Sequence, residues 1–258
     1  MEEEKLLLHK NKDLIEITTN KITKQQLKAF NYVAYKARKE LKKDHNQREF
    51  YFNYQDIEKA IDSNKTNNKF IYNTLERLRK TDVYLIKDSR NWANFSLISE
   101  VKRIEDKLQI QLPSTMCDCL LEKSYTTLDL KTIRSFKSKY TILFYELYQK
   151  YKDINFPILA ISDFKKICGI ENKKTFKDFY NVQVKILKPT LKELAKKENI
   201  FLLYKLSKKG KAYSTIQFFI SKNTDNFKLD NSELSDTETK KMFDEFKKNN
   251  ADYKNLLK

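Results

Sequence analysis

Glycine, proline and histidine are scarce in this chain of 258 residues, which holds two Gly, three Pro and two His. So few glycines leave no Gly-rich loop that could cradle phosphates, and the pattern G-x-x-x-x-G-K-[ST] is absent. The histidines, His9 and His45, lie far apart and form no H-x-H pair. These absences argue against helicase or ATPase activity and against a histidine-based metal centre.

Cysteine is also rare, and its spacing does not indicate a metal site. Cys117 and Cys119 form a lone C-x-C, and Cys168 stands alone, which is typical of reduced, buried thiols. There is no run of 18 apolar residues, and the first four residues, Met1 to Glu4, are acidic and unlike a signal peptide. We therefore expect a cytoplasmic protein that uses no metal, cofactor or membrane.

Hydrophobic residues make up 40% of the chain and aromatic residues 13%, which is enough to build cores. The net charge of +17 is spread unevenly. Residues 126–221 hold 20 basic and 8 acidic side chains, a net charge of +12, whereas residues 22–125 hold 20 and 14, a net charge of +6. An excess concentrated in one block favours an acidic partner such as nucleic acid.

Hydrophobic periodicity predicts the same order of elements twice: three helices followed by a hairpin. The first set of predicted helices and hairpin strands lies at 22–42, 54–61, 68–80, 83–86 and 95–98. The second set lies at 138–152, 162–168, 174–196, 200–206 and 213–220. In addition, residues 50–52 and 108–112 are expected to be extended, and Pro113 is expected to open a short helix.

This order predicts a helix-rich α+β protein with two tandem winged helix-turn-helix domains and short β-hairpin wings. We expect a lead-in at 1–21, a first domain at 22–125 and a second at 126–221. The remaining residues, 222–258, would form a charge-balanced tail.

One predicted helix separates its basic and apolar residues sharply. Around an ideal helix that starts at Lys174, one stripe collects five lysines and an asparagine: Lys174, Lys177, Asn181, Lys185, Lys188 and Lys192. The opposite face collects apolar residues: Phe176, Phe179, Tyr180, Leu187, Leu191 and Leu194. An ordinary solvated face usually mixes charges, so the stripe favours DNA binding. Pro189 is expected to kink this helix.

The second helix of a helix-turn-helix enters the major groove with its N-terminal residues near base edges. Lys173, Lys174, Lys177 and Asn181 are therefore candidates for base and nearby phosphate contacts, and the later lysines for the backbone. The hairpin tip adds three wing candidates: Lys208, Lys209 and Lys211. The helix at 68–80 shows a weaker version of the same division. Its outward face offers four candidates for DNA contacts, Lys69, Asn73, Arg79 and Lys80, but it also carries the acidic residue Glu76.

Several segments resemble the initiator Rep proteins of theta-replicating plasmids that carry iterons. Ser138-Lys139-Tyr140 followed by Leu143-Phe144-Tyr145-Glu146-Leu147 is similar to that family's S-K-Y-x-x-x-L-Y-E-L helix. Phe176–Phe179 with Ile186–Leu191 resembles its F-x-x-F…V-L-x-P-A-L recognition helix. Asn11–Glu16 with Ile22–Gln26 is similar to its N-terminal N-x-L-x-x-A…L-T-x-x-E segment, with Gln26 where an acidic residue is common.

The resemblance implies two winged-helix domains, of which the C-terminal one binds direct repeats in the double-stranded DNA of the origin. It also implies a monomer that initiates replication and a homodimer that represses its own promoter. Host replication proteins are then further candidate partners, and no catalytic activity is expected.

Two other functions compete with this interpretation. A rolling-circle nicking enzyme would use a histidine pair for a metal and a tyrosine nucleophile, and the histidine pair is missing. A transcriptional regulator without a role in replication needs the same DNA readout as an initiator. Direct repeats near the gene would favour the initiator, whereas a lone palindrome at the promoter would favour the regulator.

Overall fold

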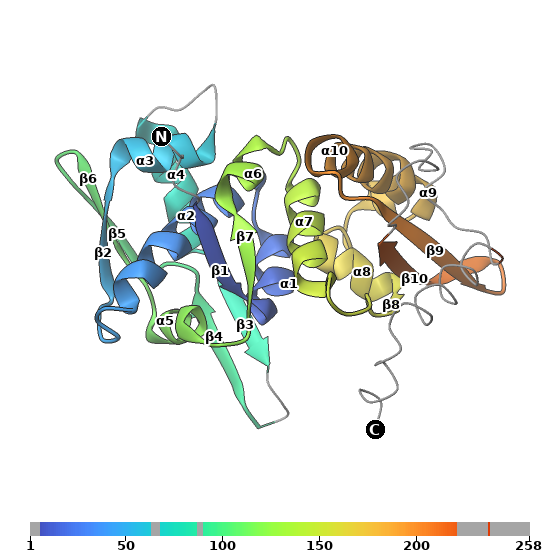
Figure 1. Ribbon diagram of the computed structural model, residues 1–258, viewed down its shortest axis with the longest axis horizontal. Coiled ribbons are helices and arrows are strands. Elements are labelled where there is room, and N and C mark those ends of the chain that lie inside the picture. The colour runs from blue at the N-terminus through green and yellow to red at the C-terminus, as the bar shows by residue number, and fades with distance from the viewer. Residues whose placement is uncertain (1–5, 63–67, 87–89, 221–236, 238–258) are drawn as a thin grey trace. The chain divides into compact units, whose positions relative to one another are not determined.

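The computed structural model describes residues 6–62, 68–86, 90–220 and 237. The expected tail at 222–258 therefore lies outside the described residues apart from Thr237. The described residues form two compact units (Figure 1), the first comprising those from 6 to 153 together with 166–172, and the second comprising 154–165 and 173–220.

The first unit contains the predicted series of helices. These are α2 (Lys24–Leu41), α3 (Tyr54–Ile61) and α4 (Asn68–Arg79). Helix α2 begins with a capping box, in which Gln26 N–H donates to the hydroxyl of Thr23 and Thr23 N–H donates to the Gln26 side chain. The side-chain amide of Gln26 therefore accepts the hydrogen bond that a Glu carboxylate often accepts at the third position of such a helix.

Three small antiparallel sheets complete the first unit. A ribbon joins β3 (Asp82–Ile86) to β4 (Trp92–Ser96) as the predicted wing, and β2 (Glu49–Asn53) pairs with β6 (Lys107–Gln111). Strand β6 also pairs with β5 (Glu100–Ile104), and α5 (Ser114–Leu121) follows Pro113 as expected.

The ends of the first unit lie outside the boundaries expected from the sequence. Strand β1 (Leu7–Asn11) pairs with β7 (Tyr125–Asp129), and three more helices belong to this unit: α1 (Lys12–Lys21), α6 (Leu130–Ser135) and α7 (Lys139–Tyr151). Helix α1 packs against α7. Residues 7–21 are thus an integral part of the first unit, which continues to residue 153 and past the expected boundary at 125.

A buried ion pair joins three segments of this unit. Lys10 on β1 donates to Glu146 on α7 over 2.9 Å, and both side chains are fully buried. Asn31 on α2 donates to the other carboxylate oxygen of Glu146 over 2.8 Å. Because removal of one partner would leave a buried charge uncompensated, substitution of Lys10 or Glu146 is expected to destabilise the unit strongly.

The second unit is built around a three-stranded antiparallel sheet in the order β8-β10-β9. Its strands are β8 (Leu159–Ala160), β9 (Leu202–Lys209) and β10 (Ala212–Ile220). The first residues of helix α8 (Ile161–Cys168) belong to this unit, up to Lys165. The helix ends at Gly169, whose φ of 63° is the left-handed conformation expected of a glycine after a helix. The rings of Phe164, Phe179 and Phe218 pack together in the core.

The third helix of this unit is not the continuous helix predicted from Lys174. A short 3₁₀ turn at Lys174–Phe176 is followed by extended Asp178, with φ −75° and ψ 126°, and only then by α9 (Phe179–Val182). A π turn at Gln183–Leu187 leads into α10 (Lys188–Glu198). The π turn directly precedes Pro189, so a widened turn accommodates a residue that cannot donate a backbone hydrogen bond.

Candidate nucleic-acid interface

The start of the recognition helix is set by an aspartate. The carboxylate of Asp178 accepts a hydrogen bond from Tyr180 N–H over 2.9 Å and caps α9. Just before it, the Lys165 ammonium donates to the Lys177 carbonyl over 3.0 Å. These contacts hold the chain in the bend that separates the 3₁₀ turn from α9.

The bend divides the predicted lysine stripe into two groups. Lys185, Lys188 and Lys192 are exposed on the π turn and α10, whereas Asn181 is half-buried on α9. Three further lysines are exposed in the segment that precedes α9: Lys173, Lys174 and Lys177. The prediction of a single stripe running from Lys174 was therefore wrong. Asp178 is extended, so helical periodicity cannot be continued from Lys174 through this residue.

The bend also reverses the expected position of Tyr180. The sequence places Tyr180 on the core face, but 65% of its surface is exposed, and Val184, four residues later, is 40% exposed. The sequence signal for this bend is Asp178, because aspartate is a common N-cap residue and indicates a helix that begins at Phe179. From that start, Phe179, Val182 and Ile186 are the buried positions.

A polar contact anchors the helix to the sheet of the second unit. The Gln183 amide in the π turn donates to the hydroxyl of Tyr204 on β9 over 3.1 Å, and Tyr204 is almost fully buried. Burial of Leu187, Leu191 and Leu194 continues the packed face along α10. The outward face is thereby fixed relative to the core of the unit.

The wing is the β9–β10 hairpin, and its tip is basic as predicted. Gly210 has a φ of 65° at the first position of a two-residue turn, a conformation that glycine adopts without strain. Lys208, Lys209 and Lys211 are exposed around it. The Lys208 ammonium lies 5.0 Å from the centre of the Tyr213 ring, which orders this side chain near the tip.

No carboxylate among the described residues forms an ion pair with the lysines of the helix face. The salt bridge found on α10 instead joins Lys197 to Glu193 over 3.3 Å, away from Lys188 and Lys192. An exposed cationic face without internal counterions favours binding of a polyanion, because binding releases condensed counterions without breaking ion pairs in the protein.

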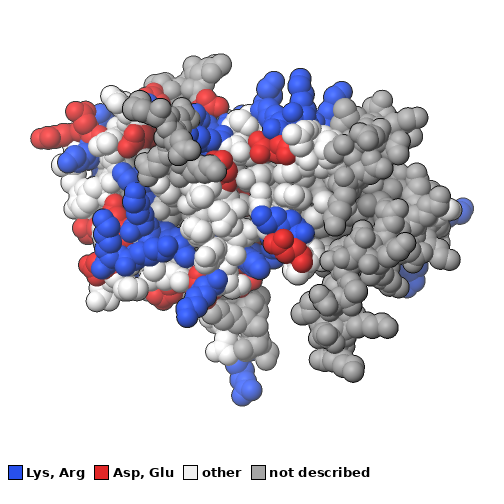
Figure 2. All heavy atoms as spheres, in the orientation of Figure 1, with Lys and Arg blue, Asp and Glu red and all other residues white. Residues whose placement is uncertain are grey.

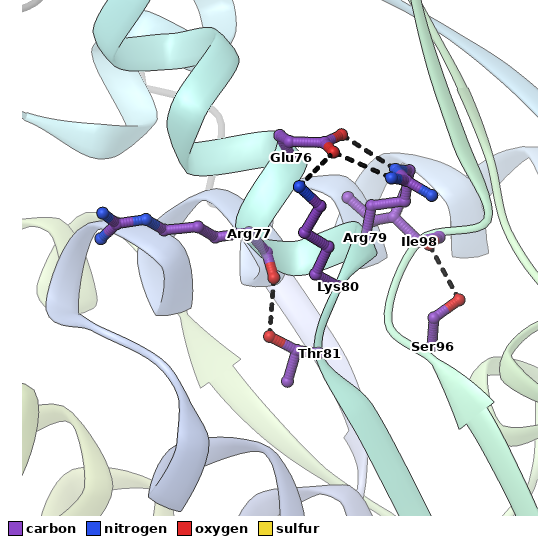
Figure 3. A network of polar contacts seen from close by, with 7 residues as sticks. All are labelled: Glu76, Arg77, Arg79, Lys80, Thr81, Ser96 and Ile98. Atoms are coloured by element: carbon purple, nitrogen blue, oxygen red, sulfur yellow. Dashed lines mark hydrogen bonds and ion pairs between the residues drawn. The ribbon is translucent and has the colours of Figure 1, made fainter.

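The corresponding helix of the first unit has a different electrostatic arrangement. Three predicted residues on α4 are exposed, namely Lys69, Asn73 and Arg79, as are Tyr72 on the same helix and Lys80 directly after it. Glu76 accepts two hydrogen bonds of 2.8 Å from Arg79 and lies 3.1 Å from Lys80 (Figure 3). These donors lower the pKa of the Glu76 carboxyl to about 2, and Glu76 raises the pKa of Arg79.

Charge is mixed across the visible face of the first unit. Figure 2 shows basic and acidic side chains interspersed over the part where α2 and β2 lie. One exposed pair in this unit joins Lys102 to Glu100 over 3.0 Å. Mixed charge is typical of an ordinary solvated surface.

The remaining reactive side chains do not form a second site in the described part of the chain. Cys117, Cys119 and Cys168 are reduced and buried, and burial raises the pKa of Cys168 to about 12. No cluster of three His, Cys, Asp or Glu able to hold a metal occurs among the described residues. None of the described helices is long and apolar enough to cross a membrane.

Two winged helix-turn-helix units, one of them with a basic recognition helix and wing, define a DNA-binding protein of the double winged-helix class. Two family models match the chain: "Initiator Replication protein, WH1" over residues 7–149 and "Initiator Rep protein, WH2" over residues 160–220. The chain belongs to the family of initiator replication (Rep) proteins.

The solved Pi initiator structure shows the same fold. A crystal structure of Pi initiator protein in complex with iteron DNA matches 86% of this chain and 100% of its own, with 16% identity and a TM-score of 0.59. Domains 2 and 3 of RctB match 76% of this chain and 80% of their own, with 11% identity and a TM-score of 0.45. The search of curated proteins finds no match to this sequence.

Proposed function

We propose that this protein initiates plasmid replication by binding direct repeats in the origin through the α9–α10 face and the β9–β10 wing. The observation that carries the proposal is the set of exposed lysines on this helix face, which have no carboxylate partner among the described residues. The structurally similar Pi initiator was solved in complex with iteron DNA, which supports this choice of ligand.

The candidate residues would contact different parts of the DNA according to their position along the helix. Lys177, which precedes α9, and Asn181, which lies on it, are proposed to contact base edges, together with phosphates reached by Lys173 and Lys174. Lys185, Lys188 and Lys192 would contact the phosphate backbone farther along. The three wing lysines, Lys208, Lys209 and Lys211, would contact the backbone beside the groove.

The first unit is proposed to have a secondary role in DNA binding. Lys69 and Asn73 lie on the exposed face of α4, but Glu76 already engages Arg79 and Lys80. This helix would therefore add few phosphate contacts.

We propose that the protein acts by binding alone, in the cytoplasm, with a homodimer that represses its own promoter and with host replication proteins as partners.

Footprinting of the purified protein on DNA that flanks its gene tests this function. Protection of direct repeats is expected, and protection of a palindrome alone would instead indicate a regulator without a role in replication. With roughly six to eight phosphates neutralised, log affinity should fall against log salt with a slope near −5 to −7. A slope near zero would contradict DNA binding altogether.

Single substitutions then separate base contacts from backbone contacts. Lys177→Ala or Asn181→Ala should lose about 1–3 kcal/mol on the cognate repeat and little on random DNA. Lys192→Ala should lose similar affinity on both sequences, which makes it the matched control. Equal losses on both sequences for Asn181→Ala would reassign that residue to the backbone.

A further inference from the structure

Two side chains that cannot bind phosphate by charge stand at the leading end of the proposed DNA-binding face. Tyr180 and Val184 are 65% and 40% exposed, and they lie one helical turn apart on the same face as Lys188. A single exposed valine is unremarkable on most surfaces. This one lies within the first two turns of a recognition helix, the part that approaches base edges.

The row formed by Tyr180, Val184, Lys188 and Lys192 changes from uncharged to basic along the helix. Tyr180 and Val184 occupy its N-terminal end, and Lys188 and Lys192 follow at successive turns of α10. Helix-capping by Asp178 and the contact of Gln183 with Tyr204 fix this end to the body of the unit. The backbone that carries the two side chains is therefore fixed by contacts within the unit.

The chemistry of the major groove supplies a matching apolar group. Each thymine presents a C5-methyl there, and no other base carries one, so apolar side chains distinguish thymine from cytosine and from uracil. Resting on the function proposed above, we propose that Tyr180 and Val184 are specificity-determining residues that contact thymine methyl groups of the repeat. The lysines that follow then hold the helix in register through the backbone.

A double-mutant cycle on modified DNA tests this assignment in the full chain. Each thymine of the footprinted repeat is replaced in turn by deoxyuridine, which removes the methyl group and keeps the hydrogen-bonding pattern. At one or two positions the wild type should lose affinity roughly fourfold, which corresponds to the burial of about one methyl group. Val184→Ala or Tyr180→Ala should lose affinity on the thymine repeat and show no further loss at those positions on deoxyuridine.

Controls separate this contact from general effects. Lys192→Ala should weaken binding to thymine and deoxyuridine repeats by the same factor. Ile104→Ala removes an apolar side chain that is 50% exposed on β5 of the first unit, and it should leave binding unchanged. Both test residues are exposed, so the variants should keep the melting temperature of the wild type.

The outcomes distinguish this inference from the proposed function. Equal losses on thymine and deoxyuridine DNA, or wild-type binding by both alanine variants, would overturn the methyl contacts while leaving repeat binding intact. Failure of the wild type to protect any repeat would instead refute the proposed function itself.

Discussion

The outward faces of α4 and of α9–α10 begin alike and then diverge. Tyr72-Asn73 on α4 and Tyr180-Asn181 on α9 each place an exposed tyrosine at the leading end, with 61% and 65% of its surface accessible. Four residues later stands Glu76 in the first unit and Val184 in the second. The fold is shared, so this difference in side chains decides what each helix offers to a ligand.

A single carboxylate changes the availability of the cations that follow it. Glu76 engages Arg79 and Lys80, so a phosphate would have to displace an existing partner and approach a negative charge. Val184 leaves Lys185 and Lys188 without such a partner among the described residues. Two corresponding helices of one chain can therefore differ in DNA affinity because a nearby carboxylate neutralises the cations of one of them.

The largest effect is expected when the second helix is made to resemble the first. Val184→Glu places a carboxylate one turn from Lys188, where it would pair with lysines and repel phosphates. Affinity for the cognate repeat should fall by about 2 kcal/mol, roughly thirtyfold, in a titration at fixed salt. Val184→Gln is the matched neutral control and should lose clearly less. Equal losses for the two variants would show that charge at this position is irrelevant.

The reverse change should sharpen the comparison with a smaller effect. Glu76→Gln removes the carboxylate that holds Arg79 and Lys80, and affinity for random DNA at low salt should rise by about threefold. Glu100→Gln also breaks an exposed pair, with Lys102 on β5, and should leave DNA affinity unchanged. If both variants gain equally, the gain reflects net charge and carries no information about α4.

The smallest expected effect is a pH dependence of stability at Glu76. Its pKa in the folded protein is lowered to about 2 from an ordinary value of 4.5. The ion pairs therefore stabilise the fold fully above pH 4.5, and this contribution disappears as pH falls toward 2. The difference in unfolding free energy between wild type and Glu76→Gln should shrink over this window. A difference that is constant from pH 7 to 2 would contradict the pairing.

Local patterns predicted much of the fold because they depend on near neighbours. The helices at 24–41, 54–61 and 68–79 and both hairpin wings have clear periodicity or turn chemistry. Strand β1 was missed because its partner, β7, is distant in sequence. Nor does any local signal indicate that Lys10 is buried, since its counterion Glu146 comes from α7.

For the candidate residues, exposure was predicted more accurately than the local backbone geometry. Exposure of the lysines at 185, 188 and 192 and at the wing tip is confirmed. The predicted orientation of Tyr180 was wrong, because helical periodicity was extended through Asp178, whose side chain caps a new helix. Competition between a capping side chain and the continuing helix is hard to resolve from one sequence.

The most direct test of the division between the two units compares two triple variants of the full chain on the footprinted repeat. Lys185, Lys188 and Lys192 are changed to alanine in one variant, and Lys69, Arg79 and Lys80 in the other. We expect the first variant to lose most of its affinity and its salt slope to become shallower by roughly 2 to 3, at about 0.9 per phosphate contact. The second variant should change little. Equal losses, or a larger loss in the first-unit variant, would contradict the assignment of DNA binding to α9–α10.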